Sequence, residues 1–219
     1  MIEIKNLYLK YIREYYALCD INLKVQKGES LALIGDEGSG KTTLLRVLAK
    51  LEKYDRGEIY LKEINLKKID YKNDVNLGYV PLKPVFLENK TVYENLKYVL
   101  QERKVKETDI ENLVDNALIE YNLERYREQK VENLSTYEKY VISFVRLSLR
   151  PLDIVLIDNI FESLSQEETD YIVQLIKKLF ISKKVTTLVA ASDEKILKGT
   201  CKKVIYFSYG TIVEKPSKS

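Results

Sequence analysis

One glycine-rich stretch constrains what this chain can fold into more than any other part of its sequence. The apolar run at 29–34 before it is typical of a strand, and the apolar spacing at 41–51 after it is helical. The stretch fits the pattern GxxxxGK[ST], and it lies between a predicted strand and a predicted helix, as this pattern requires. A glycine-rich turn that matched the pattern by chance would not need these two neighbours. The stretch reads Gly35-Asp36-Glu37-Gly38-Ser39-Gly40-Lys41-Thr42-Thr43. We therefore expect a fold built around a phosphate-binding loop.

The residue types in this loop suit the binding of a polyphosphate. Its three glycines let the backbone wrap a phosphate chain and present N–H groups and the positive end of the next helix to it. Lys41 is predicted to reach the β- and γ-phosphates, and the Thr42 hydroxyl is predicted to ligate Mg²⁺. Asp36 and Glu37 belong to the predicted binding loop and add carboxylates to it, but side chains there can point outward while the backbone binds the phosphates.

A second apolar run supplies the acid that a magnesium site needs. Residues 154–157 are typical of a parallel strand buried on both faces, and Asp158 ends the run. Asp158 is predicted to provide the carboxylate for Mg²⁺. Guanine-specific proteins with such a loop normally carry an N/TKxD motif after a strand, and this sequence has none. The predicted ligand is therefore MgATP.

The composition excludes several other kinds of chemistry. The chain has no histidine, which rules out the serine triad and His-ligated zinc. Its 36 Lys+Arg and 33 Asp+Glu form no basic block, so no nucleic-acid partner is expected. Cys19 and Cys201 lack metal spacing and are predicted to be reduced, part-buried thiols in an intracellular protein. Neither a signal peptide nor a membrane span of about 18 apolar residues is expected.

Apolar periodicity predicts an alternating α/β chain that forms a single domain, 1–219. Helical periodicity and high charge predict a helical subdomain at about 88–150, with helices at 92–103 and 109–121 and a further helix capped by Ser135. Its charge run, 102–130, is predicted to be a solvated face. A helix is also expected at 167–180. The other predicted strands lie at 2–9, 18–25, 58–61, 77–81, 186–191 and, as a hairpin, 204–213.

Three further motifs follow one another in the same order and at the same spacing as the motifs of one known family. They are Gly78-Tyr79-Val80-Pro81 before Leu82, Leu134-Ser135-Thr136-Tyr137-Glu138, and Glu162-Ser163-Leu164-Ser165 after Asp158. With the phosphate loop, they make the chain resemble the ATP-binding subunit of ABC (ATP-binding cassette) systems along nearly its whole length. The resemblance implies an α/β P-loop NTPase fold with an ABC-type core sheet, an N-terminal antiparallel β part and the helical subdomain. It also implies that Tyr11 stacks on adenine, the alternative being an ordinary strand-end tyrosine.

Three positions depart from this family where it carries hydrolytic groups. The family's Glu after the magnesium Asp is Asn159 here, and an amide cannot take up a proton near neutral pH. The family's Gln is Leu82, which cannot ligate Mg²⁺ or hold a water, and its switch His is Ser192. The resemblance therefore implies a nucleotide site without catalytic residues, in which these three positions are degenerate.

The signature loop departs from the family as well. In the family, two dimer-related subunits enclose two ATPs, and the glycines of Leu-Ser-Gly-Gly-Gln let a helix N-terminus approach the opposite γ-phosphate. Thr136 and Tyr137 add side chains at those glycines, and Glu138 adds a negative charge, so the contact in trans is expected to be weakened. Ser135 is retained and is predicted to donate one hydrogen bond in trans. Ser165 replaces an Asp in the loop after the magnesium Asp.

The resemblance implies a cytoplasmic ATPase-type subunit that binds ATP and Mg²⁺, docks a transmembrane subunit and hydrolyses ATP weakly or not at all. It would form a homodimer, or a heterodimer with another ABC subunit, on the inner face of the cell membrane through its partner. The alternative is a non-hydrolysing regulatory or scaffold protein with no transport role. The stretch 90–96 is similar to the corresponding helix start of bacterial importers, lipoprotein-release systems and cell-division ATPases. Of these, the lipoprotein-release and cell-division types are favoured as the nearest subgroup.

Overall fold

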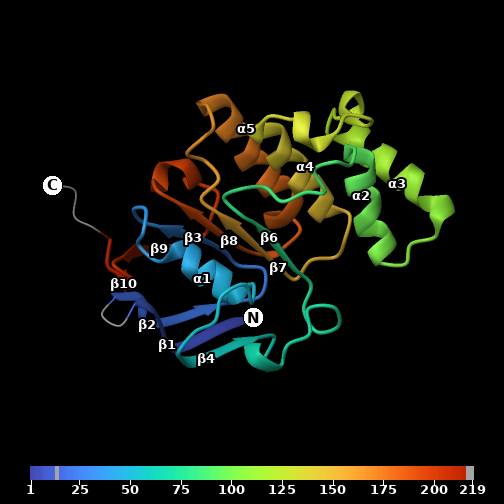
Figure 1. Cartoon of the computed structure of the whole chain (residues 1–219). Coiled ribbons are helices and arrows are strands. Elements are labelled where there is room, and N and C mark those ends of the chain that lie inside the picture. Colours follow the sequence, from blue (N-terminus) through green and yellow to red (C-terminus); the bar gives the residue numbers. More distant parts are fainter. Residues whose placement is uncertain (13–14, 216–219) are drawn as a thin grey trace. The chain divides into compact units, whose positions relative to one another are not determined.

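The computed structural model describes residues 1–12 and 15–215, which form two compact units (Figure 1). One unit comprises residues 1–82 and the chain from 153 onward, and the other is Lys83–Leu152. The second unit includes the stretch of about 88–150 in which we expect a helical subdomain. The assignment of the whole chain to a single domain stays a prediction. None of the helices in the described ranges is long and apolar enough to cross a membrane.

The first unit contains an antiparallel sheet with the strand order β2-β1-β4-β5. Ile2 and Ile4 of β1 are buried and pair with Val25 and Leu23 of β2, so alternate side chains face one core. The strands are β1 (Ile2–Ile12), β2 (Tyr15–Val25), β4 (Arg56–Leu61) and β5 (Ile64–Asn65). Sequence analysis did not predict β5, because a strand of 2 residues has no detectable periodicity.

The second sheet of this unit has the order β10-β9-β3-β8-β7-β6 and is parallel except for the β10–β9 pair. Its strands are β3 (Ser30–Ile34), β6 (Leu77–Val80), β7 (Ile154–Asp158), β8 (Thr186–Ala191), β9 (Lys203–Ser208) and β10 (Thr211–Val213). Every residue of β3, β7 and β8 is buried, as expected of parallel strands covered on both faces. Val80 pairs with Ile157, and Asp158 with Ala190, so β6, β7 and β8 end at the same edge.

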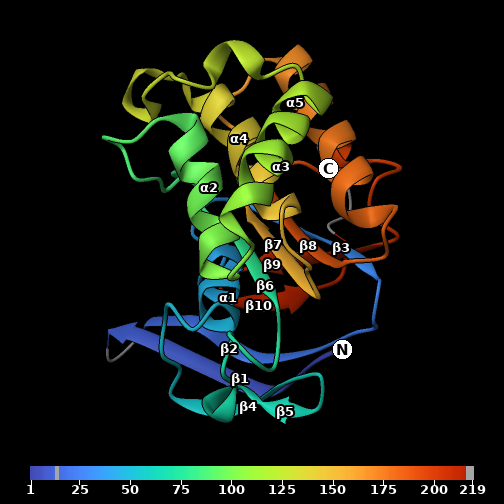
Figure 2. The same ribbon diagram turned by 90° about the vertical axis from the view of Figure 1, so that its right-hand side faces the viewer.

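Helix α1 (Lys41–Leu48) lies between the two sheets, as Figure 2 shows. Its fully buried side chains belong to a core cluster that includes residues of both sheets. They are Leu44, Leu45, Val47 and Leu48. Burial of one such side chain contributes about 1.5 to 3 kcal/mol, so α1 is firmly anchored. Because the glycine-rich loop leads directly into α1, this packing also fixes the loop at the edge where β7 ends.

The other long helix of the first unit is α5 (Gln166–Ile176), which continues into the π-helical turn η4 (Lys177–Ile181). The helix predicted at 167–180 is therefore confirmed, although its last turn is wider than an α-helix. Ser165 caps α5: its side chain accepts a hydrogen bond from the N–H of Glu168, and the Glu168 carboxylate accepts one from the N–H of Ser165. Short 3₁₀ turns lie at η1 (Leu66–Lys68) and η5 (Glu194–Leu197).

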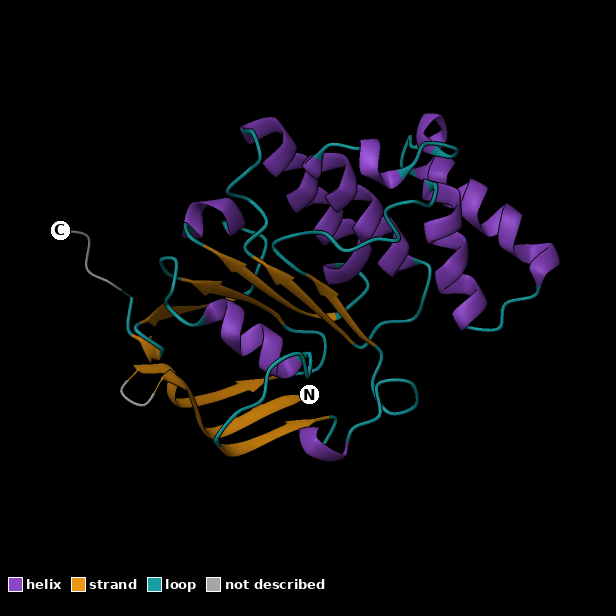
Figure 3. Ribbon diagram, viewed as in Figure 1, coloured by secondary structure: helices purple, strands orange, loops and turns teal. Residues whose placement is uncertain are grey.

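The second unit is built from helices, shown in purple in Figure 3. They are α2 (Val92–Glu102), α3 (Glu107–Glu120) and α4 (Thr136–Ser148), with 3₁₀ turns η2 (Glu124–Tyr126) and η3 (Val131–Asn133). The helices predicted at 92–103 and 109–121 are confirmed, and so is the cap at Ser135. Thr91 caps α2 in the same way, which gives both helices a capping box.

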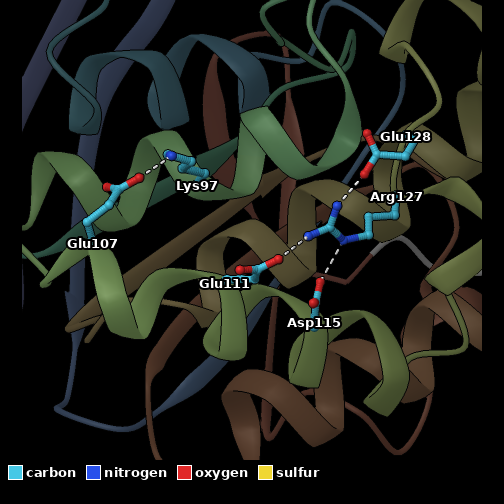
Figure 4. A network of polar contacts seen from close by, with 6 residues as sticks. All are labelled: Lys97, Glu107, Glu111, Asp115, Arg127 and Glu128. Atoms are coloured by element: carbon cyan, nitrogen blue, oxygen red, sulfur yellow. Dashed lines mark hydrogen bonds and ion pairs between the residues drawn. The ribbon is translucent and has the colours of Figure 1, made fainter.

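A network of ion pairs connects parts of the helical unit (Figure 4). Arg127 donates from Nε to Asp115 Oδ1 at 2.8 Å, and its Nη2 lies 3.3 Å from Glu111 Oε1, both on α3. Lys97 of α2 pairs with Glu107 at the start of α3. The carboxylates of Glu107, Glu111 and Glu128 stay largely exposed, so this part of the charge run is a solvated face, as predicted, whose side chains also form ion pairs.

Candidate nucleotide-binding site

Two glycines of the phosphate loop are required by close approach of other backbone segments. A Cβ atom at Gly35 would lie 2.3 Å from the carbonyl oxygen of Phe207 on β9. Gly40 has a φ of +107°, and a Cβ atom there would lie 2.7 Å from the carbonyl oxygen of Ala17 on β2. A side chain at either position would force the backbone apart. The loop is therefore held in place from both sides.

Lys41 is buried within this loop, with only 4% of its surface exposed. Its Nζ donates to the carbonyl oxygens of Gly35 at 2.5 Å and Asp36 at 2.8 Å, and it lies 3.0 Å from Ser39 Oγ. Each of these partners can only accept or can rotate to accept, so the ammonium group has three acceptors. The loop therefore carries a fixed cation at its centre.

The charges around Lys41 partly offset the cost of its burial. Burial lowers the pKa of Lys41, while nearby carboxylates act to raise it. Those carboxylates belong to Asp158, Asp36, Glu162 and Glu37. Asp36 and Glu37 are exposed, and their place in nucleotide binding stays a prediction. Glu162 begins the motif Glu162-Ser163-Leu164-Ser165, but its influence on Lys41 was not predicted from that motif.

Asp158 and Thr42 meet at the end of β7. The Thr42 hydroxyl donates to Asp158 Oδ1 at 2.7 Å, although 116 positions separate the two residues in sequence. The other carboxylate oxygen, Oδ2, accepts a hydrogen bond from the Tyr79 hydroxyl at 2.9 Å. Burial and the Asp158 charge raise the pKa of Tyr79, which keeps its phenol protonated. Tyr79 lies in a motif that we used only for family resemblance, and its contact with Asp158 was missed.

The Thr42–Asp158 pair fits a magnesium ion. A hydroxyl and a carboxylate oxygen are hard ligands of the type that Mg²⁺ prefers, and here they lie side by side at the phosphate loop. Within residues 1–12 and 15–215, no group of three or more His, Cys, Asp or Glu side chains could hold a metal on its own. Mg²⁺ is usually bound by one or two carboxylates together with substrate phosphates and waters.

Tyr11 contacts the phosphate loop. Its hydroxyl lies 3.2 Å from Thr43 Oγ1, while 53% of the residue is exposed. It also lines a cavity of about 480 Å³ together with Tyr8 and Tyr16. An exposed aromatic ring beside the loop is available for stacking, and its role in binding adenine stays a prediction.

Asn159 is buried next to Asp158, with 8% of its surface exposed. Its Nδ2 donates to Glu162 Oε1 at 2.7 Å, and its backbone N–H donates to the carbonyl oxygen of Ala190 at 3.2 Å. Its Oδ1 is buried and has no hydrogen-bond partner among the described residues. The position where we expect a missing base therefore holds an amide tied to a neighbouring carboxylate.

The other two degenerate positions lie at the same sheet edge. Leu82 follows β6 and is 47% exposed, and Ser192 follows β8 and is also exposed. Since β6, β7 and β8 end together, the structure brings Leu82, Asn159 and Ser192 to the edge that carries Asp158. None of the three side chains is a base at neutral pH.

Ser135 begins α4 in the helical unit. Its Oγ accepts from the Glu138 N–H at 3.2 Å, and its own N–H donates to Glu138 Oε2 at 2.8 Å. The Tyr126 hydroxyl donates to Glu138 Oε1. Glu138 therefore has a structural task within its own unit, and Thr136 occupies the first turn of the helix. A hydrogen bond from Ser135 in trans stays a prediction.

Known proteins share this sequence pattern. The sequence model of a family described as ABC transporter matches residues 18–162. The methionine import ATP-binding protein MetN of Clostridium acetobutylicum is 31% identical over 98% of this chain and 68% of its own length. The sn-glycerol-3-phosphate import ATP-binding protein UgpC of Bartonella bacilliformis is 28% identical over 96% of this chain, which spans 61% of that relative.

Solved structures share the fold. A dimeric structure of the ATP-binding cassette MJ0796 in a post-hydrolysis state, bound to ADP and Pi, superposes with a TM-score of 0.85 and 25% identity, covering 98% of this chain and 97% of that one. The structure of cbiO1 from Clostridium perfringens, part of the ABC transporter complex cbiONQ, has a TM-score of 0.81 and 23% identity over 97% of this chain and 86% of its own. The expected α/β fold, with an antiparallel and a mainly parallel sheet plus helices, is thus confirmed.

Proposed function

The chain belongs to the ABC transporter family of ATP-binding domains, and on that premise we propose that it binds MgATP for a membrane transport complex but hydrolyses ATP weakly or not at all by itself. The proposal rests on one observation. The groups that would bind the phosphates and Mg²⁺, called here the grip, are present, and beside them lies the sheet edge at which the hydrolytic positions are degenerate, called here the degenerate edge. The Lys41 ammonium and the Thr42–Asp158 pair form the grip. The degenerate edge carries Asn159.

The grip supports binding because each of its parts matches one part of MgATP. Lys41 would exchange its loop acceptors for β- and γ-phosphate oxygens, which are stronger acceptors because they are charged. Thr42 and Asp158 would hold Mg²⁺, which neutralises phosphate charge when it is bound. Tyr11 would stack on the adenine.

The edge supports weak hydrolysis because none of the side chains at positions 82, 159 and 192 is a base. A positioned general base typically contributes about 10²- to 10⁴-fold to a rate, and an amide at position 159 removes it. Leu82 and Ser192 offer no replacement base. Thr136 and Tyr137 place side chains in the signature loop where the family has glycines. These side chains would weaken the contact with the nucleotide of a second subunit.

We further propose a transmembrane subunit as partner. The relatives above are named import ATP-binding proteins, and one structural neighbour is part of a transporter complex. A partner of this kind would place the chain on the cytoplasmic face of a membrane, as a homodimer or as a heterodimer with another ABC subunit. The cell-division or lipoprotein-release subgroup stays a prediction. The alternative, a regulatory or scaffold protein, predicts that no membrane protein co-purifies with the chain from native membranes, with or without ATP.

Nucleotide binding is tested by comparing wild type with Lys41→Ala by isothermal titration with MgATP. Loss of hydrogen bonds to a charged group costs about 1.5 to 3 kcal/mol, so the variant should bind roughly 10- to 100-fold more weakly. Lys53→Ala, which removes an exposed lysine outside the loop, is the matched control and should bind like wild type. If wild type bound MgATP no more tightly than Lys41→Ala does, the proposal that this chain binds nucleotide would be wrong.

A further inference from the structure

Lysines gather at the edge of the parallel sheet where β3, β8 and β9 begin. They come from three segments that are far apart in sequence and that lead into these strands. All of these lysines are exposed. They are Lys27, Lys183, Lys184, Lys202 and Lys203. We call these five residues the lysine edge.

Backbone contacts hold the three segments of the lysine edge side by side. Strand β3 lies between β9 and β8 in the sheet. Toward β9, the N–H of Lys202 donates to the carbonyl oxygen of Ser30 at 3.1 Å. Toward β8, a Cβ atom at Gly28 would lie 3.3 Å from the Cβ atom of Lys184. Lys27 therefore lies between the segments that carry the other lysines, and the fold gathers charges that the sequence disperses.

The lysine edge has few negative charges to offset it. None of its ammonium groups forms an ion pair with a carboxylate of the described residues. Two carboxylates at the same edge have partners of their own. Glu29 Oε2 accepts from the N–H of Gln26 at 2.8 Å, and Asp153 pairs with Lys62 at 2.6 Å. Five lysines against Glu29 leave an excess of four positive charges, which exceeds the net charge of +3 of the whole chain.

The residue types of this edge favour a membrane surface as its partner. Nucleic-acid surfaces usually add arginine or aromatic side chains that contact bases, and residues 26–30, 182–185 and 199–203 contain neither. Lysine ammonium groups alone suit the charged headgroups of lipids, which need no base recognition. We propose that the lysine edge binds the anionic headgroups of a lipid bilayer. This inference rests on the proposed function, which places the chain on the inner face of a membrane.

Membrane binding at the lysine edge would leave the nucleotide site free. Parallel strands begin at one edge of their sheet and end at the other. Lys27 precedes the start of β3, whereas the phosphate loop follows its end. The 5 residues of β3 separate the two edges by roughly 16 Å, at about 3.3 Å per residue. The chain can therefore hold MgATP and an anionic surface at the same time.

Co-sedimentation of the full chain with lipid vesicles tests the proposal. Wild type should bind vesicles that contain about 30% phosphatidylglycerol but not vesicles of phosphatidylcholine alone, and added salt should weaken the binding. Lys184→Gln combined with Lys203→Gln should bind at least about 10-fold more weakly, because each lysine near an anionic surface raises the affinity about 5-fold. The matched control, Lys53→Gln combined with Lys68→Gln, removes the same charge from exposed lysines elsewhere and should stay within about 2-fold of wild type.

Each contrary outcome has a definite meaning. Equal loss in the two double variants, or equal binding of neutral and anionic vesicles by wild type, overturns the proposal. Binding of a DNA duplex at lower protein concentrations than the anionic vesicles also overturns it, because the partner would then be a nucleic acid. MgATP titration separates the two proposals: no MgATP binding by wild type is a failure of the proposed function, whereas normal MgATP binding without vesicle binding is a failure of this inference alone.

Discussion

At the scale of single residues, the Tyr79 hydroxyl adds a partner to the proposed magnesium ligand. It donates to Asp158 Oδ2 at 2.9 Å, while Thr42 uses the other oxygen. Hydrogen bonds of this kind orient a ligating carboxylate, and their removal typically weakens metal binding about 10- to 100-fold. Tyr79 thus belongs to the site, although it would not touch the nucleotide through this contact.

The substitution Tyr79→Phe tests this. We expect the Mg²⁺ concentration that half-saturates ATP binding to rise about 10-fold, because Asp158 loses one of its two orienting partners. Tyr60→Phe removes a comparable bond from a tyrosine to an exposed carboxylate, Glu58, on β4 and serves as the control. If Tyr79→Phe required no more Mg²⁺ than this control, the assignment of Tyr79 would be wrong.

Residue-level prediction from sequence depends on motifs that carry the chemistry. Spacing alone points to Lys41 and Thr42, whose roles in binding stay predictions, and the structure places Asp158 beside Thr42. Tyr79 and Glu162 were not identified as site residues, because their roles arise from side-chain hydrogen bonds to Asp158 and Asn159 that no spacing encodes.

At the scale of elements, the capping box of α4 accounts for two residues of the unusual signature loop, Ser135 and Glu138. Ser135 and Glu138 satisfy each other's backbone N–H groups, and Tyr126 adds a hydrogen bond to the carboxylate. Burial acts to raise the pKa of Glu138, but the hydrogen bonds from Tyr126 and Ser135 outweigh it and hold the pKa below its ordinary value of 4.5. The ionised form of Glu138 therefore stabilises the folded state.

This lowered pKa predicts a pH dependence. The stability contributed by ionised Glu138 is fully present above the ordinary pKa and is lost as the pH falls through the lowered one. Glu138→Gln should reduce the free energy of unfolding in urea by about 1 kcal/mol at pH 7, and the difference from wild type should shrink toward pH 3.5. Glu132→Gln, whose carboxylate is 3.6 Å from exposed Lys130, controls for the loss of one charge. A difference that stays constant with pH would contradict the assignment.

Elements were predicted well wherever apolar periodicity was strong. The strand at 186–191 and the helix after the phosphate loop were found because burial imposes a regular pattern on β8 and α1. The π-helical turn at η4 and the short strand β5 were not, because hydrogen-bond geometry at an element's end leaves no trace in hydropathy.

At the scale of the whole molecule, the chain combines the fold of an ATP-binding cassette with a sheet edge at which Leu82, Asn159 and Ser192 are predicted to be degenerate. Its sheets superpose on those of an ATP-binding cassette with a TM-score of 0.85. The succession of helices and strands was predictable from apolar patterning, whereas the arrangement into an antiparallel and a mainly parallel sheet was implied by the family resemblance. The partner and the transported substrate were not predictable, since they depend on surfaces that a second protein would complete.

The central claim is that this chain retains MgATP without consuming it, and the steady-state hydrolysis rate of the purified chain at saturating MgATP tests it most directly. We predict turnover far below about 1 s⁻¹, with the bound nucleotide recovered as ATP. Sustained turnover above about 1 s⁻¹ by the chain alone would contradict the account, because Asn159 could then not be the loss of the general base that we infer.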